Sequence, residues 1–248
     1  PGVYKRLLKL GIEKWGNWCK STELSLYACV PRVAVAYEVP LLFLGENPAL
    51  SWGSAGGSLD GDANRMKYNN TLKGGDLTWI LESGFKEKEI FWYLYPSDAD
   101  IERAGLRMVY LGYYIRDFND YRNSEIAIEN GMSIRVGREA RPEDMGQINN
   151  FDALDDDFVH LNQMLKYFKF GFGKVTEQCS GAIRNGMMTR EEALEMVRLY
   201  DGKCADRYIE KFCDVAGMDV KEFWRIAETY RNKEIFEPDG TGGWQLKN

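Results

Sequence analysis

The chain has 248 residues, of which 44% are hydrophobic and 13% aromatic, so it can bury a substantial core in one large or two small domains. A formal net charge of −6 and a pI near 5.1 argue against a general nucleic-acid binder, because phosphate backbones require a broad basic face. The five cysteines form no C-x-x-C pair, which indicates neither a disulfide framework nor a zinc site and favours a reducing, cytoplasmic environment.

Two helices are predicted at the amino end of the chain. Apolar residues recur at helical spacing over 4–15. Ser21 or Thr22 can cap a second helix that continues to about Tyr37. Because proline lacks a backbone N–H and crowds the preceding turn, Pro31 is expected to kink or split this second helix.

A short strand is predicted after these helices. The most apolar segment, 24–44, is interrupted by prolines and charged residues, so it cannot supply the roughly 20 apolar residues of a membrane span. Within and just after it, the run LLFLG predicts a strand at 41–45 that is buried on both faces. Glu46 and Asn47 follow this strand directly, and ligands of open α/β sheets bind beyond the carboxyl ends of the strands.

The middle of the chain predicts a long polar loop and a second strand. Residues 51–76 are rich in glycine, serine, asparagine and aspartate, and they indicate a loop or lid rather than a linker. Short helices are expected after Asp76 and after the turn at 96–98. The apolar run 106–115 predicts a second buried strand with Arg116 at its end, parallel to the first and joined to it by a right-handed crossover.

Helices dominate from Asn123 onward. Capping residues and glycines predict helices over about 123–131, 191–200, 206–216 and 220–231, and a further helix that carries His160 after the acidic cluster 152–157. We therefore predict three parts, namely an α/β domain over 1–122 with the loop 51–76, a helical region over 123–236 and a flexible tail over 237–248.

A glycine-rich turn in this helical region carries several cations. Lys169 and Lys174 flank a Phe-Gly-Phe-Gly sequence, and Arg184 follows it. Gly171 and Gly173 allow a ligand to approach the main chain closely, and flanking cations suit an anion such as phosphate. The alternative is an ordinary helix end with solvated lysines. We predict that this turn and the carboxyl ends of the two strands converge on one anion-binding cleft.

Five segments together carry a family resemblance. They are PLLFLGENP at 40–48, NRMKYNNTLKGG at 64–75, YLGYYIRDF at 110–118, HLNQMLKYFKFGFGK at 160–174 and IRNGMMTREEALEMVRLYDG at 183–202. In this combination and order the chain resembles the N-acetyl sugar amidotransferase family of the PP-loop ATP pyrophosphatase superfamily. The resemblance implies an α/β fold in which this chain holds a partial parallel sheet of an adenine-nucleotide alpha-hydrolase-like (PP-loop) domain, followed by a helical carboxy-terminal region.

The resemblance also implies a reaction. Such enzymes convert the acetamido group of a nucleotide-activated N-acetyl sugar to an acetamidino group, in bacterial surface polysaccharide or flagellin sugar biosynthesis. ATP with Mg²⁺ would activate the amide oxygen, and ammonia from glutaminase and ammonia-channel subunits would attack the activated carbon. Neither nucleic acid nor a membrane is expected as a partner.

One expected motif is missing from the sequence. The family's Ser-Gly-Gly-x-Asp-Ser loop, which cradles ATP phosphates, is not found, and residues 54–60 lack its order. We therefore expect the chain to be the carboxy-terminal portion of a longer enzyme. A noncatalytic sugar-nucleotide binding module and a glutaminase-docking scaffold are the alternatives.

The resemblance and the residue types together assign roles to individual residues. The catalytic candidates are Glu46, Asn47 and Lys169. Glu46 could bind Mg²⁺ or guide ammonia, and no residue is assigned as a dedicated metal ligand. The candidates for substrate or phosphate binding are Arg65, Lys67, Arg116, His160, Lys174 and Arg184. His160 comes shortly after consecutive aspartates, so a helix cap or an ion-pair partner is the alternative to a proton carrier.

Overall fold

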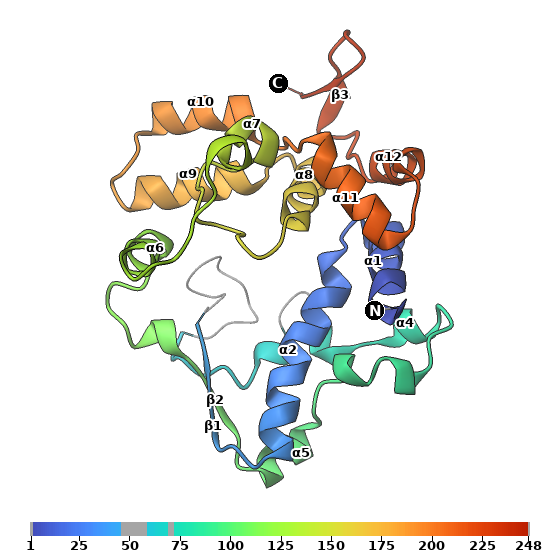
Figure 1. The fold of residues 1–248 in the computed structure, drawn as a ribbon, viewed down its shortest axis with the longest axis vertical. Coiled ribbons are helices and arrows are strands. Elements are labelled where there is room, and N and C mark those ends of the chain that lie inside the picture. Colours follow the sequence, from blue (N-terminus) through green and yellow to red (C-terminus); the bar gives the residue numbers. More distant parts are fainter. Residues whose placement is uncertain (1, 46–58, 69–71, 248) are drawn as a thin grey trace. The chain divides into compact units, whose positions relative to one another are not determined.

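The computed structural model describes residues 2–45, 59–68 and 72–247, and the chain divides into two compact units. The first unit comprises Pro1–Leu7 and Lys20–Ala127, and the second comprises Leu8–Cys19 and Ile128–Asn248. The described elements are mostly helices with a small parallel sheet (Figure 1), which confirms a mixed α/β fold class. The finer assignment to the PP-loop fold stays a prediction.

The two predicted amino-terminal helices are α1 (Gly2–Trp15) and α2 (Cys19–Ala36). Pro31 lies inside α2, so the predicted split of this helix is wrong. Pro31 lies on the buried side of α2 with Leu24 and Ala28, and this packing offsets the roughly 3 kcal/mol that an interior proline costs. Among the helices that the structure describes, none combines the length and the apolar content needed to cross a membrane.

The two predicted strands pair in parallel. β1 (Leu41–Leu44) lies beside β2 (Arg107–Tyr110), with Leu41 opposite Arg107 and Leu44 opposite Tyr110 (Figure 1). β2 is shorter than the predicted strand, because the chain enters the 3₁₀ helix η5 (Leu111–Tyr113) directly after Tyr110. The predicted position of Arg116 at the strand end is therefore corrected to a position beyond η5.

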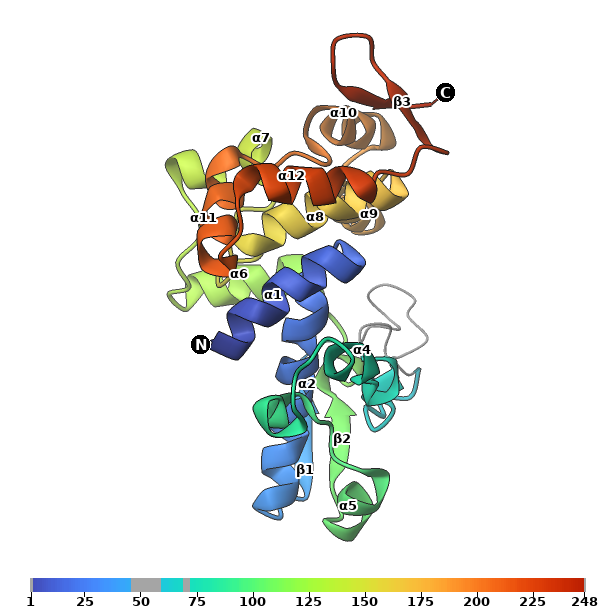
Figure 2. The same cartoon turned by 90° about the vertical axis from the view of Figure 1, so that its right-hand side faces the viewer.

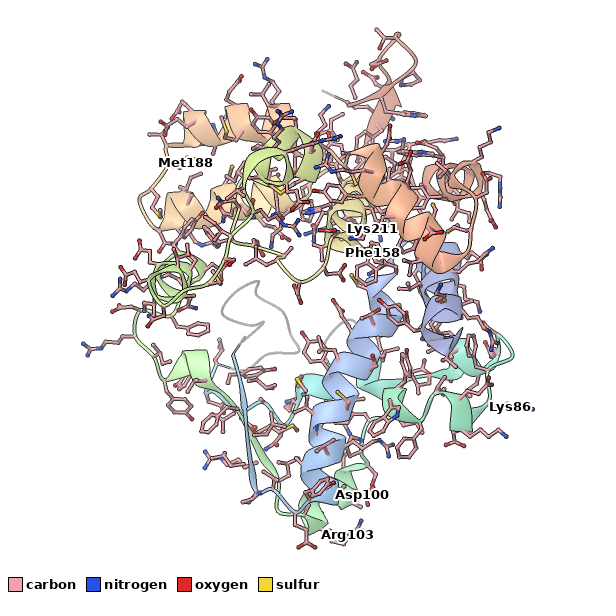
Figure 3. All side chains as sticks on the ribbon, in the orientation of Figure 1. Lys86, Asp100, Arg103, Phe158, Met188 and Lys211 are labelled. Carbon is pink, nitrogen blue, oxygen red and sulfur yellow. The ribbon has the colours of Figure 1, made fainter. Side chains whose placement is uncertain are left out.

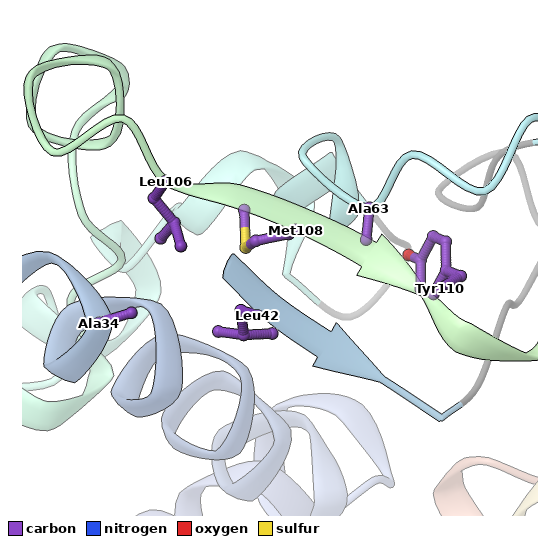
Figure 4. Packing of buried hydrophobic residues seen from close by; sticks show 6 residues of the cluster. All are labelled: Ala34, Leu42, Ala63, Leu106, Met108 and Tyr110. Carbon is purple, nitrogen blue, oxygen red and sulfur yellow. The ribbon is translucent and has the colours of Figure 1, made fainter. Parts of the chain in front are cut away.

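One face of β1 and β2 packs against α2, as Figure 4 shows. The buried cluster between them consists of Ala34, Leu42, Ala63, Leu106, Met108 and Tyr110. The neighbouring side chains of β1 behave differently, since Leu41 is 43% exposed and Phe43 is 58% exposed. The prediction that this strand is buried on both faces is therefore wrong, and its side chains alternate between core and surface with the period of two that a pleated strand imposes.

Short helices connect β1 to β2. They are η1 (Met66–Tyr68), η2 (Lys73–Gly75), α4 (Thr78–Leu81), η3 (Glu87–Glu89), η4 (Phe91–Tyr93) and α5 (Asp98–Arg103). Two of the predicted helix starts are confirmed by their hydrogen bonds. The Thr78 N–H donates to Asp76 Oδ1 at 2.9 Å, and the Asp100 N–H donates to Ser97 Oγ at 3.1 Å.

Capping signals predict several of the helices that follow, although α6 begins at Asp120 and not at the predicted Asn123 or Ser124. They are α6 (Asp120–Glu129), η6 (Gly137–Ala140), α7 (Pro142–Met145), α8 (Phe158–Phe170), α9 (Lys174–Arg184), α10 (Arg190–Tyr200), α11 (Asp206–Ala216) and α12 (Val220–Thr229). Thr189 and Glu192 form the predicted capping box, since the Thr189 hydroxyl accepts from the Glu192 N–H at 3.2 Å and the Glu192 carboxylate accepts from the Thr189 N–H at 2.8 Å. α11 ends at Gly217, as predicted, with a φ of +67°.

In the second unit α8 lies beside α11 (Figure 2), and aromatic side chains pack between the two helices. The rings of Phe158 and Phe212 are perpendicular, with centroids 5.3 Å apart. Trp18 also packs on Phe158 and donates its indole N–H to the Phe158 carbonyl at 2.9 Å. The α9 and α10 helices lie side by side and share a smaller core around Val175 and Ala193.

The carboxy-terminal tail forms a hairpin, and its predicted flexibility stays a prediction. β3 (Phe236–Pro238) pairs antiparallel with β4 (Trp244–Leu246). The Arg231 guanidinium lies over the Phe168 ring at 3.6 Å and over the Trp244 ring at 5.2 Å. This cation–π stack joins the hairpin to α8, a contact between distant residues that the turn-rich composition of the tail does not reveal.

Candidate functional site

The carboxyl ends of β1 and β2 lie at the same edge, because the two strands are parallel. We call this the carboxyl edge, and it is the place where ligands bind in open α/β sheets. On the β1 side the described chain reaches Gly45, and the predicted catalytic residues Glu46 and Asn47 lie outside the described residues. The described side chains near this edge therefore come from β2, from the residues after it and from a second segment.

Residues 60–64 form that second segment. They run antiparallel to β2, since the Tyr110 N–H donates to the Gly61 carbonyl at 2.8 Å and the Ala63 N–H donates to the Met108 carbonyl at 3.0 Å. The segment thus lies against β2 and reaches the carboxyl edge at Gly61.

Three polar side chains fix the conformation of this segment by accepting hydrogen bonds from backbone N–H groups. Asp60 Oδ1 accepts from the Asp62 N–H at 3.1 Å, Asp62 Oδ1 accepts from the Asn64 N–H at 2.8 Å, and Asn64 Oδ1 accepts from the Met108 N–H at 3.1 Å. Asp62 is exposed, so its carboxylate remains in contact with solvent. Within the described part of the chain, no three or more His, Cys, Asp or Glu side chains gather closely enough to hold a metal ion.

Two tyrosines pack against the backbone of Gly61. A Cβ atom at this position would lie 2.8 Å from Tyr113 Cδ1 and 3.0 Å from Tyr114 Cε2. The two rings are perpendicular, with centroids 5.1 Å apart, and both side chains are exposed. The carboxyl edge therefore carries an aromatic surface close to Asp62.

Gly61→Ala should lower the free energy of unfolding by about 2 kcal/mol. Gly61 has a φ of +80°, which other residues rarely adopt, and the added methyl group must displace the tyrosine pair. Gly105→Ala is the matched control, because Gly105 has a φ of +60° but open space around it, and it should cost only about 1 kcal/mol. Urea unfolding measures both losses, and equal losses would contradict the close packing of the tyrosines.

The three predicted cations of the first unit differ in whether another described residue already binds their side chains. Arg116 follows Tyr114 by two residues, is exposed, and makes no hydrogen bond or ion pair with another described residue. The Arg65 side chain is also exposed and unpaired among the described residues, but the chain leads it towards the amino end of β2. Lys67 forms an ion pair with Asp98; burial lowers the Lys67 pKa, but the hydrogen bond and charge of Asp98 outweigh burial and raise it.

The glycine-rich turn between α8 and α9 binds an anion that belongs to the protein itself. The Gly173 N–H donates to Asp201 Oδ2 at 2.8 Å, the Val175 N–H donates to Asp201 Oδ1 at 3.1 Å, and the Thr176 hydroxyl donates to Asp201 Oδ2 at 2.6 Å. Asp201 is only 7% exposed. A Cβ atom on Gly173 would lie 2.7 Å from Asp201 Oδ1, so the glycine makes room for this carboxylate rather than for an external phosphate.

The lysines beside this turn have partners within the chain. Lys169 Nζ donates to the carbonyls of Gly16 at 3.1 Å and Trp15 at 3.4 Å, at the carboxyl end of α1, where a cation is favourable. Burial lowers the pKa of Lys169. Lys174 pairs with Asp152 at 2.9 Å. The roles of Lys169 in catalysis and of Lys174 in phosphate binding stay predictions that require these contacts to open.

Arg184 differs from these lysines. It lies in the last turn of α9, is exposed, and its side chain has no hydrogen bond or ion pair with any described residue. Figure 3 shows the turn that follows it, which is labelled at Met188. The predicted convergence of the strand ends with the glycine-rich turn stays a prediction, because Glu46 lies outside the described residues.

His160 lies in the interior of the second unit. It is 1% exposed, its ring centroid lies 4.5 Å from that of Tyr208, and neither ring nitrogen has a hydrogen-bond partner of ordinary geometry. Burial, assisted by the positive charge of Arg135, lowers its pKa to about 4. The preceding Asp157 pairs with Arg135 at 2.9 Å and with Lys211 at 2.7 Å. His160 is therefore a neutral, enclosed side chain near neutral pH, and the ion pair proposed for it is made by Arg135 and Lys211 instead.

The free energy of unfolding should fall as the pH drops below the pKa of an ordinary histidine. The pKa of His160 is about 4 in the folded chain against 6.5 for an unperturbed histidine, so the unfolded chain takes up the proton first. The contribution is complete above pH 6.5 and is lost as the pH falls towards 4. We expect a loss of about 2 kcal/mol between about pH 7.5 and about pH 5 in urea unfolding. In the His160→Leu variant the free energy of unfolding should change less with pH over this range. An unchanged pH dependence would assign the effect to other groups.

Sequence reasoning missed several of these residues. Asp62, Tyr113 and Tyr114 were not recognised at the carboxyl edge, although a glycine between two aspartates was a local signal for a tight, polar turn. No local signal could connect Asp201 with Gly173, since the two residues lie 28 positions apart and meet only through the packing of α9 and α10.

Comparison with known proteins relates the helical part of the chain to a family. No curated protein matches the chain. Residues 145–248, which include α8 to α12 and the carboxy-terminal hairpin, match a family model described as LPS biosynthesis protein WbpG-like, C-terminal domain. The match supports a relation of this part of the chain to WbpG-like proteins of lipopolysaccharide biosynthesis.

Proposed function

We propose that the protein carrying this chain is an ATP-dependent amidotransferase that converts the acetamido group of a nucleotide-activated sugar to an acetamidino group in lipopolysaccharide biosynthesis. The family match of residues 145–248 supports the biosynthetic context, and the five segments quoted above support the reaction. The single observation that carries the proposal is the carboxyl edge, with an exposed carboxylate at Asp62 and two exposed tyrosine rings, followed two residues along the chain by the exposed cation Arg116.

Each of these side chains has a chemical role in the proposal. Arg116 binds the diphosphate of the sugar nucleotide, because its guanidinium is always charged and presents parallel N–H donors. The rings of Tyr113 and Tyr114 offer an apolar face to the sugar or to the base. Asp62 accepts a proton from the attacking nitrogen, or holds a sugar hydroxyl in place. Glu46 and Asn47, which follow β1, complete the edge in this proposal.

The described residues do not fit an ATP phosphate site at the glycine-rich turn. Asp201 already takes up the Gly173 and Val175 N–H groups, and Lys169 and Lys174 are engaged with other groups of the chain. We therefore assign ATP and Mg²⁺ to no described residue. The proposal places the reaction in the cytoplasm and takes its ammonia from a glutaminase partner.

Product analysis tests the proposal. The protein that carries this chain is incubated with a nucleotide-activated N-acetyl sugar, ATP, Mg²⁺ and ammonium, and the sugar is examined by mass spectrometry. We expect a product in which the acetamido oxygen is replaced by NH, together with AMP. The matched control is the same sugar nucleotide with a free amine, which has no amide to convert. AMP formation without any amidine, or no reaction with any N-acetyl sugar nucleotide, would overturn the proposal.

A noncatalytic sugar-nucleotide binding module is the second candidate. It is favoured by the internal occupation of the glycine-rich turn by Asp201, which leaves the backbone N–H groups of this turn unavailable to a nucleotide. This candidate predicts calorimetric binding of the sugar nucleotide, no binding of ATP and no amidine. Formation of the amidine with AMP would eliminate it.

A further inference from the structure

The outer face of α2 carries an exposed apolar stripe. Leu26 is 57% exposed, Val30 and Val33 are each 45% exposed, and Tyr37 is 78% exposed. Tyr37 continues the helical geometry, since its N–H donates to the Val33 carbonyl at 3.0 Å. Because successive residues turn by about 100°, these side chains fall within an arc of about 60° around the helix. The opposite face, which includes Leu24, is buried.

An apolar pocket of about 360 Å³ opens beside the carboxyl half of this stripe. Val33 and Tyr37 line it from α2, and the exposed rings of Phe91 and Trp92 line it from η4. Arg32 also lines the pocket, but its guanidinium lies over the Phe91 ring at 4.2 Å and its Nε donates to a backbone carbonyl. The pocket extends as far as Asp100, which is labelled on α5 in Figure 3. The stripe and the pocket thus form one continuous apolar surface.

The spacing of the stripe is the same when it is read from either end. Leu26, Val30, Val33 and Tyr37 are separated by four, three and four positions, which is the spacing of a helix–helix seam. Two antiparallel α2 helices related by a twofold axis midway between Val30 and Val33 bring Val30 of each copy against Val33 of the other. Leu26 of each copy then faces Tyr37 of the other, at the mouth of its pocket. Isologous interfaces require such a self-complementary surface.

The exposed area is of the right size for a small dimer interface. Covered aromatic side chains bury about 150–250 Å² each, so the exposed fractions of Tyr37, Phe91 and Trp92, which are 78%, 46% and 56%, correspond to roughly 350 Å². The aliphatic residues of the stripe bring the total to about 600 Å² per copy, or about 1,200 Å² in a pair, which is the low end of specific interfaces. A contiguous apolar patch of this size is at the upper limit for a monomer.

We infer that two copies of this chain associate through the stripe Leu26, Val30, Val33 and Tyr37 and the adjoining pocket, with their α2 helices antiparallel about a twofold axis. The inference rests only on residues of the first unit and does not depend on the proposed function. An interface at the low end of specific areas predicts a reversible dimer with a Kd in the micromolar range. The free energy gained by burying so small an apolar area exceeds the free-energy cost of association only slightly.

Analytical ultracentrifugation tests the association. The unmodified chain, measured from about 1 μM to about 200 μM, should pass reversibly from monomer to dimer over this range. Val33→Glu places a charge on each side of the twofold axis and should raise the Kd at least about 100-fold. Val136→Glu is the matched control, because Val136 is a 71% exposed valine that belongs neither to the stripe nor to the first unit. A chain that stays monomeric throughout, or an equal loss in both variants, overturns the inference.

Disulfide cross-linking tests the orientation. In a Cys29→Ser background, the variant that combines Leu26→Cys with Tyr37→Cys should form a disulfide between copies on mild oxidation. Leu26→Cys alone should not, because the two copies of position 26 lie about 16 Å apart along an antiparallel pair of helices. Cross-linking of Leu26→Cys alone, mapped by peptide mass spectrometry, would indicate a parallel pair and overturn the proposed symmetry.

Discussion

Replacing Arg116 by alanine should lower kcat/KM for amidine formation about 10²-fold, because a preorganised charged donor at the diphosphate typically contributes a factor of about 10² to 10³. Arg116 is exposed and makes no hydrogen bond or ion pair with described residues, so its removal should leave the free energy of unfolding nearly unchanged. Arg116→Lys should recover only part of the loss, since lysine keeps the charge but not the forked geometry. Initial rates of product formation, measured by mass spectrometry over a range of sugar nucleotide concentrations, check these values.

The matched control for this prediction is Arg103→Ala. Arg103 is also exposed, but it lies on α5, before the amino end of β2, and pairs with Asp100 (Figure 3). Its removal changes the net charge by the same amount at the other end of the strand and should leave kcat/KM within about twofold of the unmodified value. A similar loss in both variants would show that general charge, and not the carboxyl edge, determines the rate.

Asp201→Ala should lower the free energy of unfolding by about 3–4 kcal/mol. The carboxylate accepts two backbone N–H groups and the Thr176 hydroxyl in a nearly buried site, and the alanine leaves all three donors without a partner. The substitution should mainly weaken the packing of α9 against α10, two helices whose shared core includes Val175. Urea unfolding monitored by circular dichroism measures the change.

Thr176→Val provides the comparison for Asp201. It removes one of the three hydrogen bonds and keeps the shape of the side chain, so it should cost only about 1 kcal/mol. If an external anion were the natural occupant of the turn, added phosphate would restore the stability of Asp201→Ala. Such a rescue, or a loss no greater than that of Thr176→Val, would contradict the internal role of this carboxylate.

Helix ends were the part of the fold that the sequence predicted best. The capping box of Thr189 and Glu192 and the glycine end at Gly217 are made by residues within a few positions of one another. The parallel pairing of β1 and β2 was also predictable, because two apolar runs separated by a long connection favour it.

Features that depend on tertiary contacts could not be predicted in the same way. Pro31 remains inside α2 because its ring packs in the core, a contact that local propensity does not include. Leu41 and Phe43 are exposed, although a continuous apolar run is typical of a strand covered on both sides. The hairpin at the carboxyl end contacts the Arg231 guanidinium through Trp244, a contact that the composition of the tail does not reveal.

In the candidate site, too, local features were predictable from the sequence and tertiary contacts were not. The rule for strand ends directed attention to the region after β2, where Arg116 is exposed, and the role of Arg116 stays a prediction. The cations of the glycine-rich turn have partners that are remote in sequence, since Lys169 meets Gly16 across 153 positions and Gly173 meets Asp201 across 28. A motif of lysines and glycines predicts an affinity for an anion, and only the fold reveals that the anion is an aspartate of the same chain.

Isothermal titration calorimetry of this chain with a UDP-activated N-acetyl sugar tests most directly the claim that the carboxyl edge binds the substrate. We expect saturable binding that is lost in Arg116→Ala and kept in Lys174→Ala. Binding that survives Arg116→Ala but disappears in Lys174→Ala would place the substrate at the glycine-rich turn and contradict the account.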